Sequence, residues 1–319
     1  MAAINLIFEV NYAAFSVFAT LLITEIMGAV LLLIAWDAAR KRVLDYVVPM
    51  WEITGTFGAL WVVTGYFAYP SLLVPVASIF APLLIVFLLL FVARNTSISF
   101  AEFILKRGWL DEEKLYKAYA ISTVVLGLIV LVLLSSLVGG QGVNLPKGTF
   151  SLASWATAGN LLFVVGTLAL AVGLAPAFYD LPSIRKLILP FGVAGMAISV
   201  LAFYAMSPAL VTGWISVPVL LTLIAALLYL WPKTTRIVAN KAVFILVVSV
   251  IVFSLQSLIY PKVIGQALSI DAFTTGGVMA TTFYTITVVG SMVLGAMLVL
   301  YVAVAYRGTG GPDSPLASR

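Results

Sequence analysis

The sequence predicts an all-α membrane protein, a bundle of helices that cross the bilayer. Hydrophobic residues make up 63% of the 319 residues and charged residues only 9%, whereas a soluble domain carries about 25% charged residues. The apolar stretches are roughly 20 residues long, which is the length that a helix needs to cross a bilayer. A transmembrane β-barrel would show shorter segments of alternating polarity. The chain is therefore expected to be polytopic, with little mass outside the membrane.

Nine apolar segments are expected to be transmembrane helices. Pro70 separates the second from the third, and Ser207-Pro208 separates the sixth from the seventh, because proline disfavours continuation of a helix. The segments are 12–36, 46–69, 71–93, 118–138, 153–175, 187–207, 210–231, 242–260 and 277–306.

The basic residues predict the orientation of these helices. Of the 17 Lys and Arg residues, all but Lys147 and Lys262 fall on one side of a nine-helix topology, in the segments 37–45, 94–117, 185–186 and 233–241 and in the C-terminal tail. Because basic residues accumulate in cytoplasmic loops, the N-terminus is predicted outside and the C-terminus in the cytoplasm. The expected location is the plasma membrane.

The chain divides into two units of four helices and a ninth helix. Residues 1–145 form the first unit and 146–262 the second, and 263–307 hold a loop and the last helix. The tail 308–319 is rich in Gly, Pro and Ser and is expected to be disordered.

Two carboxylates lie inside apolar segments and are the main candidates for chemistry. An ionisable side chain within a membrane span costs several kcal/mol, on the order of 2.5 or more, and marks a functional site by default. Glu25 is expected about halfway across the membrane. Glu52 is expected about six residues from the cytoplasmic face, or about 9 Å deep. The two acids are therefore predicted to relay protons, with Glu52 as the cytoplasm-side acceptor and Glu25 as the deeper station.

Small and polar neighbours support this prediction. Thr24 and Thr56 can hold water, and Gly28 and Gly55 leave room for water or a close helix. The alternative is that each Glu is a structural acid, hydrogen-bonded within the bundle.

The chain contains no Cys and no His. Thiolate chemistry is excluded, and the commonest ligand of haem, zinc and copper is absent. No cofactor is therefore expected to bind this chain, and the eight Met residues are interpreted as core filler. Because the net charge of +5 comes from loop residues, no nucleic-acid partner is expected.

Two short motifs resemble those of a known family. Pro49-Met50-Trp51-Glu52 is followed by Tyr66-Phe67-Ala68-Tyr69-Pro70. This arrangement resembles subunit II of cytochrome bd-type quinol oxidases, where Pro-x-Trp-Asp is followed by Phe-Ala-Ala-Phe-Pro at the same spacing.

Further segments extend the resemblance over 20–105 and 255–307. The segment Thr24 to Gly28 resembles Gly-Phe-Asp-x-Gly of that family, and Leu268 to Ala272, with Asp271, resembles its Leu-Thr-x-x-Asp-Ala. Both family aspartates are replaced here by Glu, and the family's second acid after the Trp aligns with Gly55. The match indicates a divergent member.

The resemblance implies a haem-free subunit of a quinol oxidase complex. In the family, a larger membrane subunit holds haems b and d and the quinol site, and carboxylates of subunit II line a proton route from the cytoplasm. The expected partners are therefore a haem-binding subunit I, the lipid bilayer and a structural quinone or lipid. The chain itself would be non-catalytic.

Two other functions remain open at this point. A secondary transporter also uses midplane carboxylates and internal repeats. The membrane anchor of another quinone-linked oxidoreductase would likewise hold no cofactor of its own.

Overall fold

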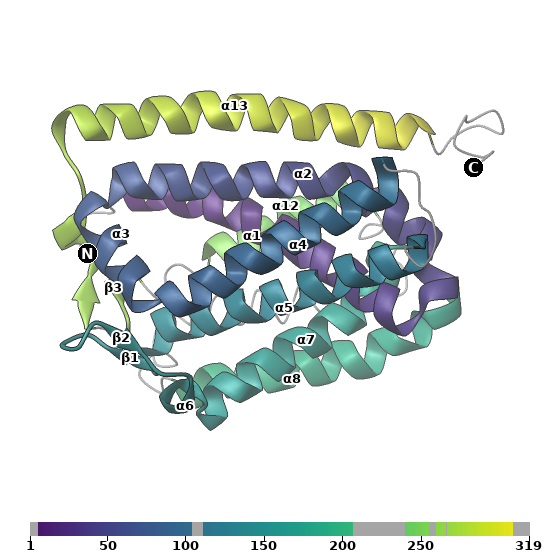
Figure 1. The fold of residues 1–319 in the computed structure, drawn as a ribbon, viewed down its shortest axis with the longest axis horizontal. Coiled ribbons are helices and arrows are strands. Elements are labelled where there is room, and N and C mark those ends of the chain that lie inside the picture. The colour runs from purple at the N-terminus through teal and green to yellow at the C-terminus, as the bar shows by residue number, and fades with distance from the viewer. Residues whose placement is uncertain (1–5, 104–110, 207–239, 255–259, 266, 309–319) are drawn as a thin grey trace.

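A computed structural model describes residues 6–103, 111–206, 240–254, 260–265 and 267–308. Long helices run side by side between two ends of the molecule (Figure 1). The long helices are α1 (Leu6–Ile34), α2 (Trp36–Ala68), α4 (Ala81–Phe103), α5 (Glu112–Gly139), α7 (Ala158–Phe178), α8 (Ile188–Met206) and α13 (Gly277–Gly308). The shorter helices are α3 (Pro70–Ile79), α6 (Leu152–Trp155), η1 (Pro182–Leu187), α12 (Lys241–Ser254) and η3 (Ile270–Phe273).

Two small antiparallel hairpins mark one end of the bundle. Strands β1 (Val143–Asn144) and β2 (Thr149–Phe150) pair with Val143 opposite Phe150, and β3 (Lys262–Val263) and β4 (Leu268–Ser269) pair with Lys262 opposite Ser269. We call this the hairpin end, and it also holds α3 and the start of α1 (Figure 1). The opposite end, where the single residue Ala35 joins α1 to α2, is called the α1–α2 end.

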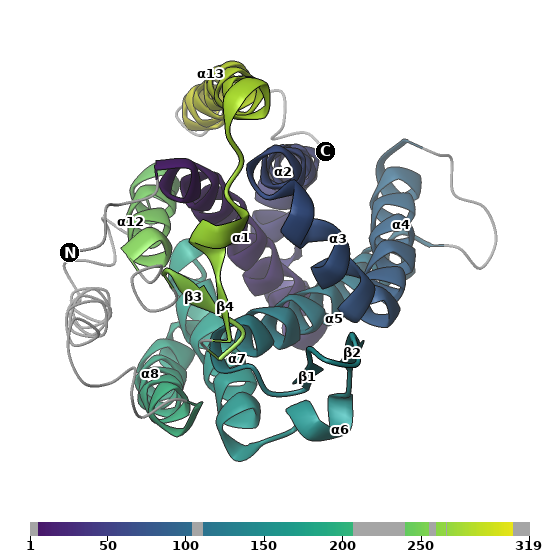
Figure 2. The same cartoon turned by 90° about the vertical axis from the view of Figure 1, so that its left-hand side faces the viewer.

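Helix α1 lies at the centre of the bundle. It packs against α2, α5, α7 and α12, whereas α4 packs mainly along α5 and α13 along α2 (Figure 2). The largest hydrophobic cluster surrounds α1 and includes Leu21, Met27, Leu31, Tyr46 and Phe178. Side chains on every face of α1 are therefore enclosed by protein.

Six of the described helices are long and apolar enough to span a membrane, namely α1, α2, α4, α5, α7 and α13. The chain is thus an all-α membrane protein, as predicted. Helices α3, α8 and α12 are shorter apolar helices within the described residues. The predicted segment 210–231 lies outside the described residues, so the total of nine spans stays a prediction.

The predicted third segment, 71–93, is wrong as a single helix. The chain forms the ten-residue helix α3, breaks at Phe80 and starts again as α4 at Ala81. Pro82 explains the break, because proline lacks the backbone N–H that would continue α3 but fits the first turn of a new helix. The span is therefore α4, which lies about ten residues later than expected.

The predicted loops 37–45 and 94–117 are also largely wrong. Helix α2 begins at Trp36 and includes Arg40, Lys41 and Arg42, and α4 continues through Arg94 to Phe103. Neither helical stretch contains Gly or Pro, and Ala, Lys and Arg favour helix. Hydropathy marks where a helix leaves hydrocarbon, whereas propensity and capping decide where it ends.

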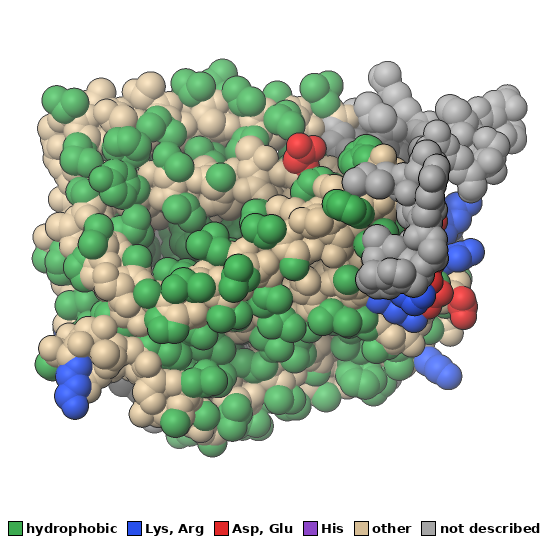
Figure 3. Space-filling view, in the orientation of Figure 1, with side chains coloured by type: hydrophobic (Ala, Val, Ile, Leu, Met, Phe, Trp, Pro, Cys, Tyr) green, Lys and Arg blue, Asp and Glu red, His purple; other side chains and the backbone are tan. Residues whose placement is uncertain are grey.

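Charged side chains gather at the ends of the bundle, and the face between the ends is mostly apolar (Figure 3). The starts of α2, α5 and α12 and the turn η1 place basic residues at the α1–α2 end. Lys147 and Lys262 lie in the hairpins at the other end. The separation of basic residues agrees with a membrane bundle, and the assignment of the α1–α2 end to the cytoplasm stays a prediction.

Glycines allow α7 and α8 to pack backbone against backbone. Gly159, Gly166 and Gly173 recur every seven residues along α7 and face α8. A Cβ atom at Gly166 would lie 2.7 Å from the backbone nitrogen of Ser199, and one at Gly173 would overlap the backbone of Gly192. Close approach of small residues is a common way to hold membrane helices together.

We predict that Gly166→Ala destabilises the protein by about 1–3 kcal/mol, because the added methyl group must push the α8 backbone away. Gly295→Ala in α13 is the matched control, since no heavy atom of the described residues lies within 4 Å of the place that its Cβ would take. Thermal unfolding of both variants in detergent measures the difference. Equal midpoints would contradict this account of the α7–α8 contact.

Candidate functional site

Glu25 of α1 lies in a fully buried ion pair. Its carboxylate is 0% exposed and pairs through Oε2 with Nη2 of Arg94 from α4, which is 2% exposed. The hydroxyl of Tyr119 from α5 donates a second hydrogen bond to the same oxygen, at 3.1 Å. Three helices therefore meet at one carboxylate, and we call Glu25, Arg94 and Tyr119 the Glu25 site.

The guanidinium of Arg94 has further contacts that fix its position. Nη1 donates to the side-chain oxygen of Asn95 at 2.9 Å. The guanidinium carbon lies 5.3 Å from the ring centroid of Tyr119 and 5.9 Å from that of Phe91. Cation–π contacts of this kind are strongest where water is excluded. The two aromatic rings thus help to hold the guanidinium in place.

Sequence reasoning misses Arg94 and Tyr119. It counts Arg94 among the basic residues of the segment 94–117, because the predicted third helix ends at residue 93. The sequence does contain a signal for this. No Gly or Pro stands near Arg94, so the helix that contains the apolar residues before it is expected to continue through Arg94. An Arg one or two turns inside a membrane helix needs a carboxylate partner, and Glu25 is the candidate.

Thr24, beside Glu25, lies in a buried cluster of tyrosines. Its hydroxyl lies 3.0 Å from that of Tyr46 in α2, and its backbone oxygen accepts a hydrogen bond of 2.7 Å from Tyr179, which follows α7. A Cβ atom at Gly28 would lie 2.5 Å from the Tyr179 hydroxyl oxygen. Gly28 thus makes room for a tyrosine, where sequence reasoning expects water or a helix backbone.

Glu52 lies on the outward face of α2, away from the Glu25 site. Its side chain is exposed, and it shares a helix face with Thr56, Ala59, Val63 and Tyr66, all exposed and spaced by three or four residues. Among the described residues, the contact found at Glu52 is through its backbone oxygen, which accepts from the Thr56 hydroxyl at 2.8 Å.

The predicted order of depth is wrong. Glu25 lies nine residues before the end of α1, about 14 Å from the α1–α2 end, whereas Glu52 lies sixteen residues after the start of α2, about 24 Å from it. The cause is the early start of α2 at Trp36, because the basic stretch 37–45 is helical. Counted from the α1–α2 end, Glu25 is reached first.

The other polar and small residues around Glu52 lie on or near the same face. Gly55 faces α4, because a Cβ atom there would lie 3.7 Å from the ring of Phe91. Pro49 is exposed and stands inside α2 without ending it, and Trp51 is partly buried. None of these side chains contacts the Glu25 site in the described hydrogen bonds and ion pairs.

The second motif shapes the hairpin end. Helix α2 ends before Tyr69, and Pro70 starts α3. Tyr69 is buried in a small cluster with Phe8 and Phe283, against which Phe67 packs, while Tyr66 points outward. The resemblance places Asp271 with these packing residues, and it is exposed in η3, where its carboxylate accepts from the Tyr260 hydroxyl at 3.0 Å.

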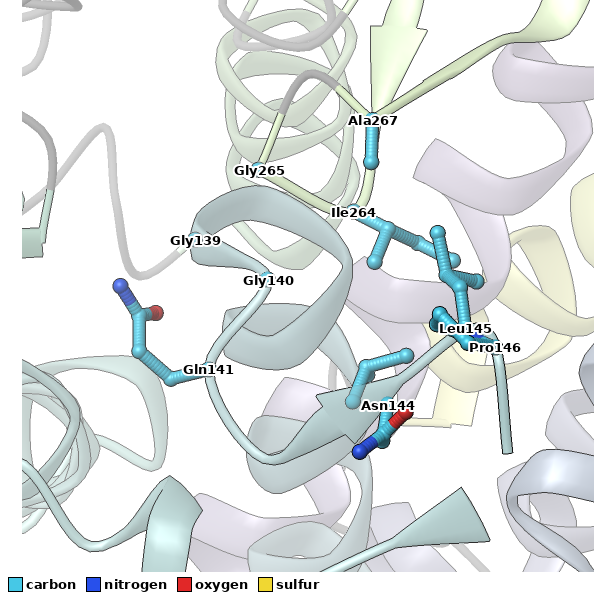
Figure 4. A pocket seen from close by; sticks show the side chains of 10 residues that line it. Gly139, Gly140, Gln141, Asn144, Leu145, Pro146, Ile264, Gly265 and Ala267 are labelled. Carbon is cyan, nitrogen blue, oxygen red and sulfur yellow. The ribbon is translucent and has the colours of Figure 1, made fainter. Parts of the chain in front are cut away.

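An open pocket of about 460 Å³ lies at the hairpin end, where the turn after α5 meets the second hairpin (Figure 4). Its walls are residues 139–141 and 143–146 together with Ile264, Gly265 and Ala267. The backbones of Gly140 and Gly265 touch there, both with positive φ. None of the ten residues around this pocket carries an ionisable side chain, so acid–base chemistry is not expected in it.

The composition of the chain predicts that it holds no haem. The sequence has no His, and the buried Met27 and Met50 belong to the hydrophobic cluster around α1. In the part of the chain that the structure describes, no group of three or more His, Cys, Asp or Glu residues gathers to hold a metal ion. That the chain is haem-free stays a prediction from its composition.

Comparison with known proteins identifies the fold. No protein-family model matches the chain, and no curated protein matches it. Among solved structures, the bd oxidase from Geobacillus thermodenitrificans contains a chain of the same fold, with a TM-score of 0.68 at 17% sequence identity. The match covers 93% of this chain and 97% of that chain.

The protein is therefore an integral membrane helix bundle, and its fold is of the cytochrome bd type. The fold is the one that the motifs around Glu25 and Glu52 predict. The low identity agrees with a divergent relative.

We predict that Glu25→Gln lowers the free energy of unfolding by about 3–5 kcal/mol, because it leaves the Arg94 guanidinium buried without its counter-charge. Glu52→Gln is the matched control and should change stability by less than about 0.5 kcal/mol, since its side chain is exposed. Unfolding in mixed micelles compares the two. A loss of equal size in both variants would contradict the assignment of Glu25 to the core.

Proposed function

We propose that this chain is a haem-free integral subunit of a bd-type quinol:oxygen oxidoreductase complex in the plasma membrane. The observation that carries the proposal is the bd-type fold over almost the whole chain. A second support is a sequence without His. The haems b and d and the quinol site would belong to a larger partner subunit, and a quinone or lipid held structurally by the complex fits an apolar bundle of this kind.

The outward face of α2 is the proposed contact with that partner. An ionisable side chain facing hydrocarbon costs about 2.5 kcal/mol or more, and Glu52 stands among exposed apolar residues such as Val63. A partner helix with a hydrogen-bond donor or a cation opposite Glu52 removes this cost. The exposed face of α4, with Leu88 and Leu89, borders the same side of the bundle.

Glu25 and Glu52 are the proposed proton-carrying groups. Measured along the helices, a proton that enters at the α1–α2 end reaches the depth of Glu25 before that of Glu52. Glu52 then stands at the boundary with the partner, where it can pass a proton out of the chain. Thr24 and Thr56, beside the two acids, are the proposed anchors for water along this route.

Isolation of the native complex tests the proposed partner. The chain would be tagged at its C-terminus, purified in mild detergent, and its reduced-minus-oxidised visible spectrum recorded. We expect b- or d-type haem bands together with a larger membrane chain that contains His. A colourless eluate with this chain alone would contradict the proposal.

We predict that Glu52→Gln lowers the rate of oxygen consumption per haem by roughly tenfold or more, because Gln cannot carry the proton. The amount of assembled complex should not change, since Gln keeps the size and polarity of the side chain. Glu113→Gln, an exposed acid at the start of α5, is the control and should leave the rate unchanged. Oxygen-electrode assays on complex normalised to haem content give both values, and an unchanged rate in Glu52→Gln would remove Glu52 from the route.

A further inference from the structure

In the Glu25 site, only some of the buried polar atoms have hydrogen-bond partners among the described residues. Oε1 of Glu25 and Nε of Arg94 are both buried and have no hydrogen-bond partner among the residues that the structure describes, while Oε2 and Nη2 pair with each other. Leaving a buried charged group unsatisfied is unfavourable, because the group has lost its water without gaining a protein partner. One carboxylate oxygen therefore stays open for an additional hydrogen, while the other is occupied by Arg94 and Tyr119.

We propose that Arg94 and Tyr119 are the positioning residues that control when Glu25 takes up a proton, an inference that rests on the proposed role of Glu25 as a proton carrier. Arg94 supplies the charge that favours the carboxylate form. Tyr119 supplies a hydrogen bond that also favours it. Neither residue transfers the proton itself.

The step is a proton addition with a change of site charge. A proton binds to Glu25 at the open Oε1, and no other bond breaks. Arg94 keeps its own proton, so the net charge of the site rises from zero to plus one. A buried cation without its counter-charge is unfavourable, and the proton is therefore held only weakly and is passed on.

Ionisable groups of other elements also lie in this part of the bundle. From α2, Tyr46 contacts the neighbouring Thr24, and Tyr179 after α7 contacts the same residue. From α12, Lys241 lies 5.1 Å from the ring centroid of Tyr46 and so faces the tyrosine. Arg94 from α4 is the cation in direct contact with the carboxylate.

Substitutions separate the effect of the Arg94 charge from the effect of the Tyr119 hydrogen bond. Arg94→Met removes the charge and keeps an unbranched side chain, whereas Arg94→Lys keeps the charge. Tyr119→Phe removes only the hydroxyl and leaves both charges and the ring in place. Arg40→Met, at an exposed position near the start of α2, is the control for loss of a positive charge.

The measurement is an infrared pH titration of the purified complex, which follows the carbonyl band of a protonated carboxyl group. Glu25→Gln identifies the part of the band that belongs to Glu25. In Tyr119→Phe the band should appear at a higher pH than in the unaltered complex, because the carboxylate has lost a hydrogen bond that favours its charged form. In Arg94→Met the upward shift should be larger, and Arg94→Lys and Arg40→Met should titrate as the unaltered complex does.

Identical titrations in the unaltered complex, Tyr119→Phe and Arg94→Met would overturn the inference. Tyr119→Phe keeps the test decisive if Arg94→Met does not fold, because it retains the ion pair.

Oxygen consumption distinguishes failure of this inference from failure of the proposed function. If Glu25→Gln slows oxygen consumption while Arg94→Met and Tyr119→Phe do not, the carrier role stands and the control by Arg94 and Tyr119 is wrong. If the titrations shift as expected but Glu25→Gln consumes oxygen normally, the carrier role is wrong, and with it the inference.

Discussion

The burial of Glu25 beside Arg94 is the constraint on which the polar interior depends. Neither charge can stay in an apolar core without the other, because removing one partner leaves a charge that neither protein nor lipid can solvate. The pair therefore ties α4 to α1 across the bundle. Helix α4 packs otherwise mainly along α5, and residues such as Ile85 and Leu89 on its outer side are exposed. One ion pair thus fixes the rotation of a helix whose first half, from Ala81 to Ala93, is apolar.

The two membrane carboxylates differ in environment, and this difference separates their proposed roles. Glu25 lies between α1, α4 and α5, and its counter-charge, Arg94, belongs to the same chain. Glu52 stands on the outer face of α2, where a neighbour outside the chain must supply its hydrogen bonds. A core acid suits transfer within the subunit, and a surface acid suits transfer across a subunit boundary. The unequal burial of Glu25 and Glu52 therefore adds to the argument from the fold that the chain belongs to a complex.

Much of the architecture could be predicted from the apolar runs, but the side that each residue faces could not. The segment 277–306 corresponds to α13 within two residues, and 118–138 corresponds to α5 except that α5 begins six residues earlier. The break at Phe80 and the helical 37–45 were missed because hydropathy reports the polarity of a segment and not where a helix ends. Helix α1 is apolar on all sides, so periodicity does not reveal that Glu25 faces Arg94. The exposure of Glu52 could not be predicted for a similar reason. Apolar side chains face lipid and partner helices as well as the core, so hydropathy does not show which side of α2 is exposed.

Arg94 shows how a topological rule can conceal a functional residue. The rule that basic residues lie in cytoplasmic loops placed Arg94 correctly near the α1–α2 end but outside the bundle. Its side chain instead reaches Glu25, about two and a half turns before the end of α1. A long cationic side chain near a helix end can extend to water or turn into the bundle. A carboxylate at the same depth on a neighbouring helix favours the inward orientation. In this bundle Glu25 supplies that carboxylate, and the acid and the base that looked unrelated in the sequence form one site.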